Sequence, residues 1–78
     1  MKTISQPSYR RLVGWLIAER KFKKISQPEL AEALGLPHNS YISKIELFER
    51  KMDVYEFVQI CKALELDPHE GIEILLKP

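Results

Sequence analysis

The residues of this chain that could do enzymatic chemistry are few and widely separated. Cys61 is the only cysteine, and His38 and His69 are the only histidines. The three do not stand at the spacing of metal ligands, and no nucleophile is arranged with a histidine base. A glycine-rich phosphate loop is also missing. The sequence therefore predicts a chain that is not an enzyme and that needs neither a metal nor a cofactor.

The bulk composition predicts a small cytoplasmic protein. A length of 78 residues corresponds to one domain, and a lone cysteine cannot form an internal disulfide. No apolar stretch approaches the ~20 residues of a membrane span, so no membrane association is expected. Residues 1–24 hold seven basic side chains and one acidic one, although the net charge is only +1. This asymmetry favours a molecule with one face turned to anions.

Helix starts are easy to recognise. Residues 26–29, 53–56 and 67–70 each place Ser or Asp three positions before Glu, which is the pattern of a capping box. Apolar residues between these starts recur at helical spacing, and no alternating strand pattern is present. The sequence predicts an all-α fold. Its helices are expected near residues 8–23, 27–34, 40–47, 54–65 and 68–76.

The tetrapeptide Ile-Ser-Gln-Pro occurs twice, at residues 4–7 and 25–28. Both copies precede a predicted helix, with a serine to cap it and a proline in its first turn. Only the second copy continues into ELAEALG, so no larger unit is duplicated. Residues 1–7 are predicted to be an N-terminal arm, and residues 8–78 the domain.

Two apolar stripes end in a charged residue. The stripe of the first predicted helix runs from Val13 to Arg20, and that of the third runs from Ile42 to Glu46. An unpaired buried charge is costly, so the two charges either pair with each other or reach water at the helix ends. Periodicity alone leaves both alternatives open.

Three stretches, taken in order, resemble a known family: SQPELAEALGLP from Ser26, SYISKIE from Ser40 and ERKMDVYEFVQICKALELDP from Glu49. They are similar to the helix-turn-helix pattern of the phage Cro and cI repressors, the XRE family, over roughly residues 12–70. The resemblance implies a compact five-helix bundle of the lambda-repressor-like DNA-binding type, with the helix-turn-helix in the second and third helices. It also implies a buried pair of Arg20 and Glu46.

If the third helix lies in the major groove of double-stranded DNA, its outer face reads bases and the surrounding residues hold phosphates. The expected base-reading residues are Asn39, Ser40, Tyr41, Ser43 and Lys44. The expected phosphate contacts are Gln27, Arg50 and Lys51, of which Gln27 is implied most directly by the resemblance. Asn39 has a second interpretation, because asparagine is also a preferred N-cap.

Two features depart from the family pattern. Phe48 stands where the family usually has glycine, and a left-handed backbone there is strained for phenylalanine. The turn that contains Pro37, His38 and Asn39 is one residue longer than usual. The start of the third helix is therefore open by one position.

The last predicted helix is rich in large apolar residues. Ile72, Leu75 and Leu76 fall on one face and Ile74 on another, so one face is expected to cover the core and the other to meet a second copy of the chain. Ile72, Ile74, Leu75 and Leu76 are together the predicted dimer interface. Closure of a monomeric core, or a contact through Trp15, is the alternative.

These features together predict a sequence-specific DNA-binding transcriptional regulator. The preferred interpretation is a repressor that binds a (pseudo)palindromic operator as a homodimer. The alternative is a protein-binding module of the antitoxin or anti-repressor type, in which DNA binding is secondary.

Overall fold

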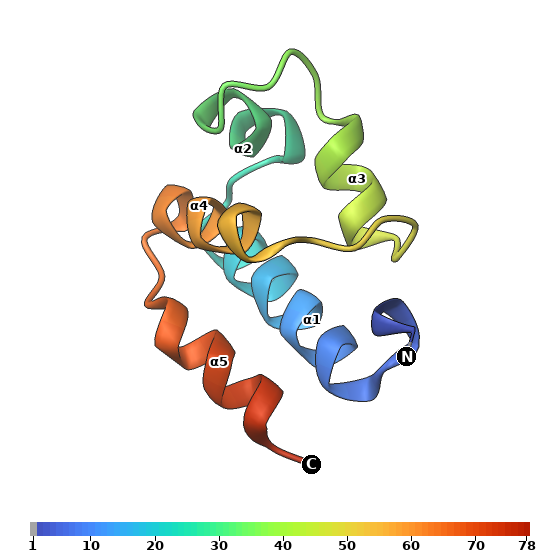
Figure 1. Cartoon of the computed structure of the whole chain (residues 1–78). Helices are drawn as coiled ribbons and strands as arrows, with labels where there is room; N and C mark the ends of the chain where they lie inside the picture. Colours follow the sequence, from blue (N-terminus) through green and yellow to red (C-terminus); the bar gives the residue numbers. More distant parts are fainter. Residues whose placement is uncertain (1) are drawn as a thin grey trace.

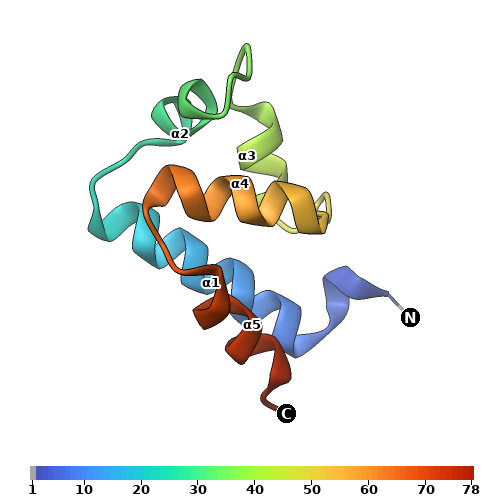
Figure 2. The same ribbon diagram turned by 60° about the vertical axis from the view of Figure 1, so that its left-hand side comes forward.

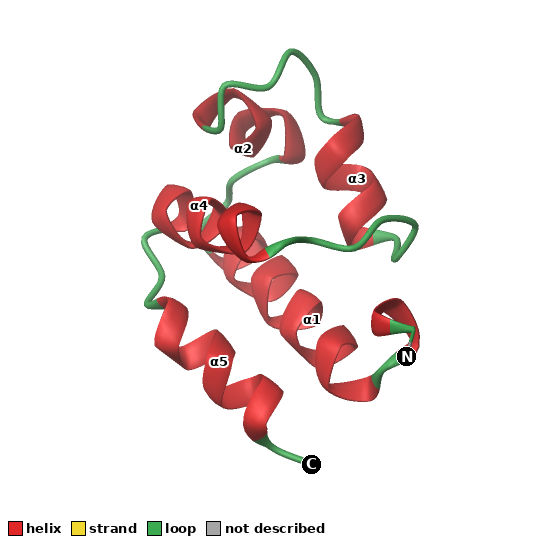
Figure 3. Cartoon of the chain, viewed as in Figure 1, coloured by secondary structure: helices red, strands yellow, loops and turns green. Residues whose placement is uncertain are grey.

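The computed structural model describes residues 2–78, all of them in helices and connecting loops (Figures 1 and 3). The elements are η1 (Thr3–Ser5), α1 (Pro7–Phe22), α2 (Gln27–Ala33), α3 (Ser40–Glu46), α4 (Val54–Leu64) and α5 (Pro68–Leu76). The prediction of an all-α fold with five helices is confirmed, and every predicted boundary lies within one residue of the observed one.

Capping hydrogen bonds explain why the helix starts could be predicted from the sequence. The Ser26 hydroxyl accepts from the backbone N–H of Glu29, and the Glu29 carboxylate accepts from the backbone N–H of Ser26, which closes a capping box. Asp53 and Glu56 form the same box at the start of α4. At the start of α5, Asp67 accepts from a backbone N–H but the reciprocal bond is replaced by a side-chain contact with the next histidine.

The two Ile-Ser-Gln-Pro copies start their helices differently. Ser26 is the N-cap of α2, as predicted, but Ser5 does not cap α1. Pro7 is already the first residue of α1, Gln6 occupies the N-cap position, and the Ser5 hydroxyl donates to the carbonyl of Lys2 instead. Because proline needs no N–H partner, α1 begins at Pro7 without a side-chain cap.

The predicted N-terminal arm lies against the domain. η1 contacts α1, Ile4 packs against the core, and Arg10 donates to the Ile4 carbonyl over 3.1 Å. Met1 of the predicted arm lies outside the described residues. The division of the chain at residue 7 stays a prediction.

α1 and α4 form the middle of the molecule. In both views α2 and α3 lie at one end and α5 at the other, and α5 contacts only α1 and α4 (Figures 1 and 2). The buried apolar core consists of Tyr9, Leu12, Val13, Leu16, Leu30, Ala31, Ile42, Ile45, Phe57, Ile60, Cys61 and Leu64. Burial raises the pKa of the Cys61 thiol to about 11, so this cysteine is part of the core.

Phe48 adopts the strained backbone that its place in the sequence suggests. Its φ is 61°, in the left-handed region where the family pattern has glycine. The Phe48 ring packs against the core, and the Arg10 guanidinium lies 4.5 Å from the ring centroid. These contacts offset a strain that glycine would avoid.

A glycine brings α5 close to the rest of the domain. Gly71 is buried, and a Cβ atom there would lie 2.6 Å from Phe57 Cζ and 2.9 Å from Leu12 Cδ1. No side chain fits in this contact. The position of α5 therefore depends on Gly71 lying directly against α1 and α4.

The structure assigns one face of α5 to the core and the other to the surface. Ile74, three residues after Gly71, shares its face and packs against the core. Ile72, Leu75 and Leu76 are 44%, 38% and 71% exposed, so of the four predicted interface residues Ile74 is the one that lies against the core. The close contact with the core is made by Gly71, so the apolar pattern of α5 did not show which face is buried.

Candidate nucleic-acid interface

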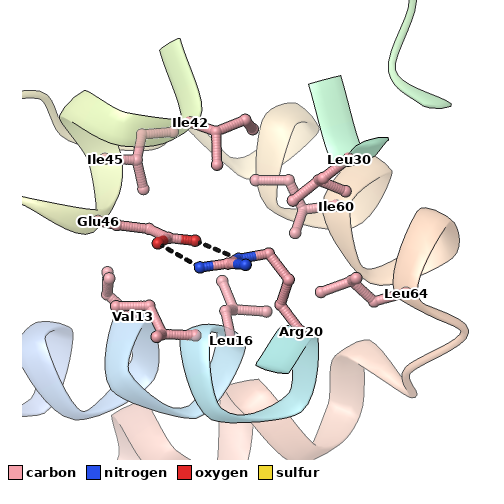
Figure 4. Close-up of a pocket in the computed structure, with 10 residues that line it drawn as sticks. Val13, Leu16, Arg20, Leu30, Ile42, Ile45, Glu46, Ile60 and Leu64 are labelled. Atoms are coloured by element: carbon pink, nitrogen blue, oxygen red, sulfur yellow. Dashed lines mark hydrogen bonds and ion pairs between the residues drawn. The ribbon is translucent and has the colours of Figure 1, made fainter. Parts of the chain in front are cut away.

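Arg20 and Glu46 form a bidentate ion pair that ties α1 to α3 (Figure 4). Arg20 Nε lies 2.7 Å from Glu46 Oε2, and Nη2 lies 2.8 Å from Oε1. Arg20 Nη1 also donates to the Ile25 carbonyl over 2.8 Å. The side chains are only 9% and 14% exposed, so of the two alternatives the structure has the pair.

Apolar residues surround this pair almost completely (Figure 4). A cavity of about 20 Å³ lies beside it, lined by Val13, Leu16, Ile17, Leu30, Ile42, Ile45, Ile60 and Leu64 together with the two charged residues. Since water is largely excluded, either charge alone would be costly there. The position of α3 on the domain is thus set by both packing and charge.

The ion pair continues outward as a chain of hydrogen bonds. Gln27 Nε2 donates to Glu46 Oε1 over 2.9 Å, and Asn39 Nδ2 donates to Gln27 Oε1 over 3.1 Å. Four side chains from α1, α3, α2 and the turn are therefore linked in sequence. Because a glutamine amide carries two N–H donors, Gln27 keeps one for an external acceptor.

The side chain of Asn39 does not cap α3, and its base reading stays a prediction. Asn39 occupies the N-cap position of α3, but its side chain makes no cap hydrogen bond. The amide is directed to Gln27 instead. The third helix begins at Ser40, as predicted. The turn at residues 35–39 therefore contains the extra residue.

Tyr41 was predicted to read bases, and the structure contradicts this placement. Its hydroxyl oxygen is buried without a hydrogen-bond partner among residues 2–78. The Arg50 guanidinium lies 4.4 Å from the ring centroid, which covers one side of the ring. Burial, together with the neighbouring Glu56 carboxylate, raises the pKa of the Tyr41 hydroxyl above its ordinary value. Tyr41 thus packs against the core and Arg50 and does not present its hydroxyl on the outer face of α3.

The outer face of α3 carries the remaining predicted readers. Ser40 and Lys44 are exposed, and Ser43 is half-buried between them. His38, which the sequence suggested only as an unsuitable metal ligand, lies beside them: its Nδ1 is 2.7 Å from Ser40 Oγ. The sequence signal that could have indicated this contact is a histidine two positions before the serine that begins the helix.

Two of the predicted phosphate contacts lie in the loop after α3. Arg50 is paired with Glu56 through bonds of 2.9 and 3.3 Å, with side chains 43% and 21% exposed. To bind a phosphate, Arg50 must exchange this carboxylate for it. Lys51 is exposed at the next position.

Three lysines, Lys21, Lys23 and Lys24, lie at and just after the end of α1, and one of them is bound within the protein. Lys23 donates to the backbone carbonyls of Leu64 and Glu65 and so holds the end of α1 to the end of α4. Lys21 and Lys24 are exposed.

No described helix is long and apolar enough to cross a membrane. Residues 2–78 also contain no group of three His, Cys, Asp or Glu side chains that could hold a metal ion.

A comparison with solved structures decides the family. No protein-family model and no curated protein sequence matches the chain. The structure of an XRE-family like protein from Pseudomonas syringae pv. tomato str. DC3000 matches with a TM-score of 0.80 and 38% sequence identity, over 87% of this chain and 82% of that one. The chain belongs to the XRE family. As an XRE-family helix-turn-helix protein it is a DNA-binding regulator and not an enzyme.

Membership of the XRE family gives the site its frame. α2 and α3 are the helix-turn-helix, and α3 takes the place of the recognition helix. Against the family pattern, this XRE-family chain has a longer turn before α3, which holds the His38–Ser40 contact, and a phenylalanine after α3. All three lie at the two ends of α3.

Proposed function

We propose that this XRE-family protein is a sequence-specific transcriptional repressor that acts in the cytoplasm on a (pseudo)palindromic operator, as a homodimer. The observation that carries the proposal is the free outer face of α3. Ser40 and Lys44 are exposed there, while Glu46, the last residue of α3, binds Arg20 and so fixes this end of the helix to α1. A recognition helix needs both properties, since its readers must be accessible and held in register.

Base reading and phosphate binding are assigned to different residues. Lys44 and Ser40 are placed to contact base edges, because they lie on the exposed face of α3. Gln27 is placed to hold a phosphate through its remaining N–H, and Lys51 supports it from the loop after α3. Arg50 contributes only where a phosphate displaces Glu56.

The test is binding to the DNA that flanks the protein's own coding region, measured at several salt concentrations. Lys44→Ala should reduce discrimination between operator and random DNA by ~1–3 kcal/mol, whereas Gln27→Ala should weaken binding to both. Lys77→Ala is the matched control, since Lys77 is an exposed lysine just after α5, at the far end of the domain from α3 (Figure 1). An equal loss on both DNAs would remove Lys44 from the readers.

The exposed apolar face of α5 supports the proposed dimer. Ile72 and Leu75 border a groove of about 300 Å³ that continues across Val54, itself 80% exposed. Burial of such a surface against a second copy is favourable. A mass near twice 9.1 kDa in sedimentation at tens of micromolar is expected.

The same apolar face also favours a second candidate, a protein-binding module of the antitoxin or anti-repressor type. A partner protein could cover Ile72 and Leu75 in place of a second copy. The two functions differ in their DNA binding. A module that acts through a partner alone forms no salt-dependent, sequence-specific complex with DNA.

A further inference from the structure

Two contacts from Ser40 indicate which ring nitrogen of His38 accepts a hydrogen bond. The backbone N–H of Ser40 points to His38 Nδ1 over 3.4 Å, and Ser40 Oγ lies 2.7 Å from the same nitrogen. A backbone N–H can only donate, so Nδ1 must be the unprotonated, accepting nitrogen. The ring proton of the neutral imidazole is therefore on Nε2.

This arrangement leaves one donor and one acceptor for an external partner. Nε2–H is the donor, since Nδ1 is occupied within the protein. The Ser40 hydroxyl directs its hydrogen to Nδ1, so that Oγ can only accept from an external partner, through its lone pairs. Both residues are exposed, and together they present a fixed donor–acceptor pattern.

The pair lies where a recognition helix meets base edges. Ser40 is the first residue of α3, and His38 precedes it in the turn that is one residue longer than the family pattern. Asn39 is directed to Gln27 and the Tyr41 hydroxyl is buried. His38 and Ser40 are thus the exposed polar side chains at this end of the helix.

We propose that His38 and Ser40 act as one base-reading unit, in which His38 Nε2–H donates to a guanine and Ser40 Oγ accepts from a neighbouring amino group. Guanine presents two acceptors, N7 and O6, in the major groove, while adenine N6 and cytosine N4 supply the amino hydrogens. The proposal rests on the proposed function, since it assigns a specificity determinant to the same DNA-binding surface.

The experiment selects binding sites from a randomised pool of DNA duplexes with the parent chain and with variants. His38→Ala should lose the preference for guanine at one position, with discrimination there reduced roughly fivefold to a hundredfold. Ser40→Ala should lose part of the same preference, and the double variant should lose no more than His38→Ala, because the two residues act together. Helicity should be unchanged in all three.

Two substitutions separate base reading from a local structural role. An asparagine at position 38 can still accept from Ser40 but has no donor at the position of Nε2, whereas a glutamine reaches that position with its amide. His38→Gln should therefore keep more of the guanine preference than His38→Asn. His69→Ala is the matched control: His69 also contacts a residue two positions away, but at the start of α5.

Each outcome decides between the two proposals. If the parent chain enriches a motif and His38→Ala enriches the same motif with discrimination within twofold, the reading unit is refuted and the proposed function stands. Full discrimination in His38→Asn would likewise show that His38 only shapes the turn. A parent chain that enriches no motif overturns both proposals.

Discussion

Removal of one partner of the Arg20–Glu46 pair should cost most of the stability of the domain. Glu46→Leu leaves the Arg20 guanidinium, 9% exposed, with only the Ile25 carbonyl among its present acceptors. A stranded buried charge of this kind costs ~3–5 kcal/mol. A domain of this size has ~5 kcal/mol of stability in total. Each kilocalorie lowers the Tm of such a domain by ~4–8 °C, so a fall of at least ~12 °C is expected.

The reciprocal substitution makes the prediction sharper. Arg20→Met should cost a similar amount, because it strands the Glu46 carboxylate among apolar side chains (Figure 4). Arg20→Met combined with Glu46→Leu removes both charges and leaves an apolar contact. The double variant should therefore be more stable than either single variant, by ~2 kcal/mol or more.

Urea unfolding followed by circular dichroism gives the free energies, provided that the midpoints from a second probe coincide. Arg50→Ala is the control, since its pair with Glu56 is half exposed and should contribute only ~0–1 kcal/mol. Single variants within about 1 kcal/mol of the parent would refute a buried pair. A double variant less stable than both singles would show that the two charges are not coupled.

Two further predictions concern α5 and its neighbours. Gly71→Ala should destabilise the domain by ~1–3 kcal/mol, because its Cβ would lie 2.6 Å from Phe57. Gly14→Ala should instead stabilise α1 by ~0.5–1 kcal/mol, because nothing lies within 4 Å of the new Cβ. Thermal melts should therefore show a lower Tm for Gly71→Ala and a higher Tm for Gly14→Ala. Ile74→Glu should unfold or loosen the domain, whereas Leu76→Glu should leave helicity intact and lower the sedimented mass. The proposed interface is wrong if Leu76→Glu leaves a dimer unchanged.

Local signals in the sequence predicted the helices well, because each start is determined by a few adjacent residues. Ser26 and Asp53 form their boxes with the glutamate three positions later, without help from the rest of the fold. Ser5 stands in a similar sequence but does not cap α1, since Pro7 begins that helix two residues later. The family pattern also indicated the partner of Arg20, which periodicity alone left open.

Predictions that needed tertiary contacts were less successful. Ile74 was expected in the dimer interface, but it shares the face of Gly71, whose close approach places that face against the core. Tyr41 was expected on the outer face of α3, but the loop after α3 returns Arg50 over its ring. His38 was overlooked because its partner in the structure is Ser40, a residue two positions away in the sequence. None of these contacts has a periodic signature.

The chain of side chains from Arg20 to Asn39 narrows the reading surface of this protein. Glu46 accepts from both Arg20 and Gln27, so the group that anchors α3 also orients the predicted phosphate contact. Asn39 completes the orientation of Gln27 by donating to its side-chain oxygen. Stability and DNA affinity are consequently linked through Glu46, and substitutions there cannot separate them. In the proposed function, sequence preference is left to the exposed side chains of α3 and of the longer turn before it, which contains His38.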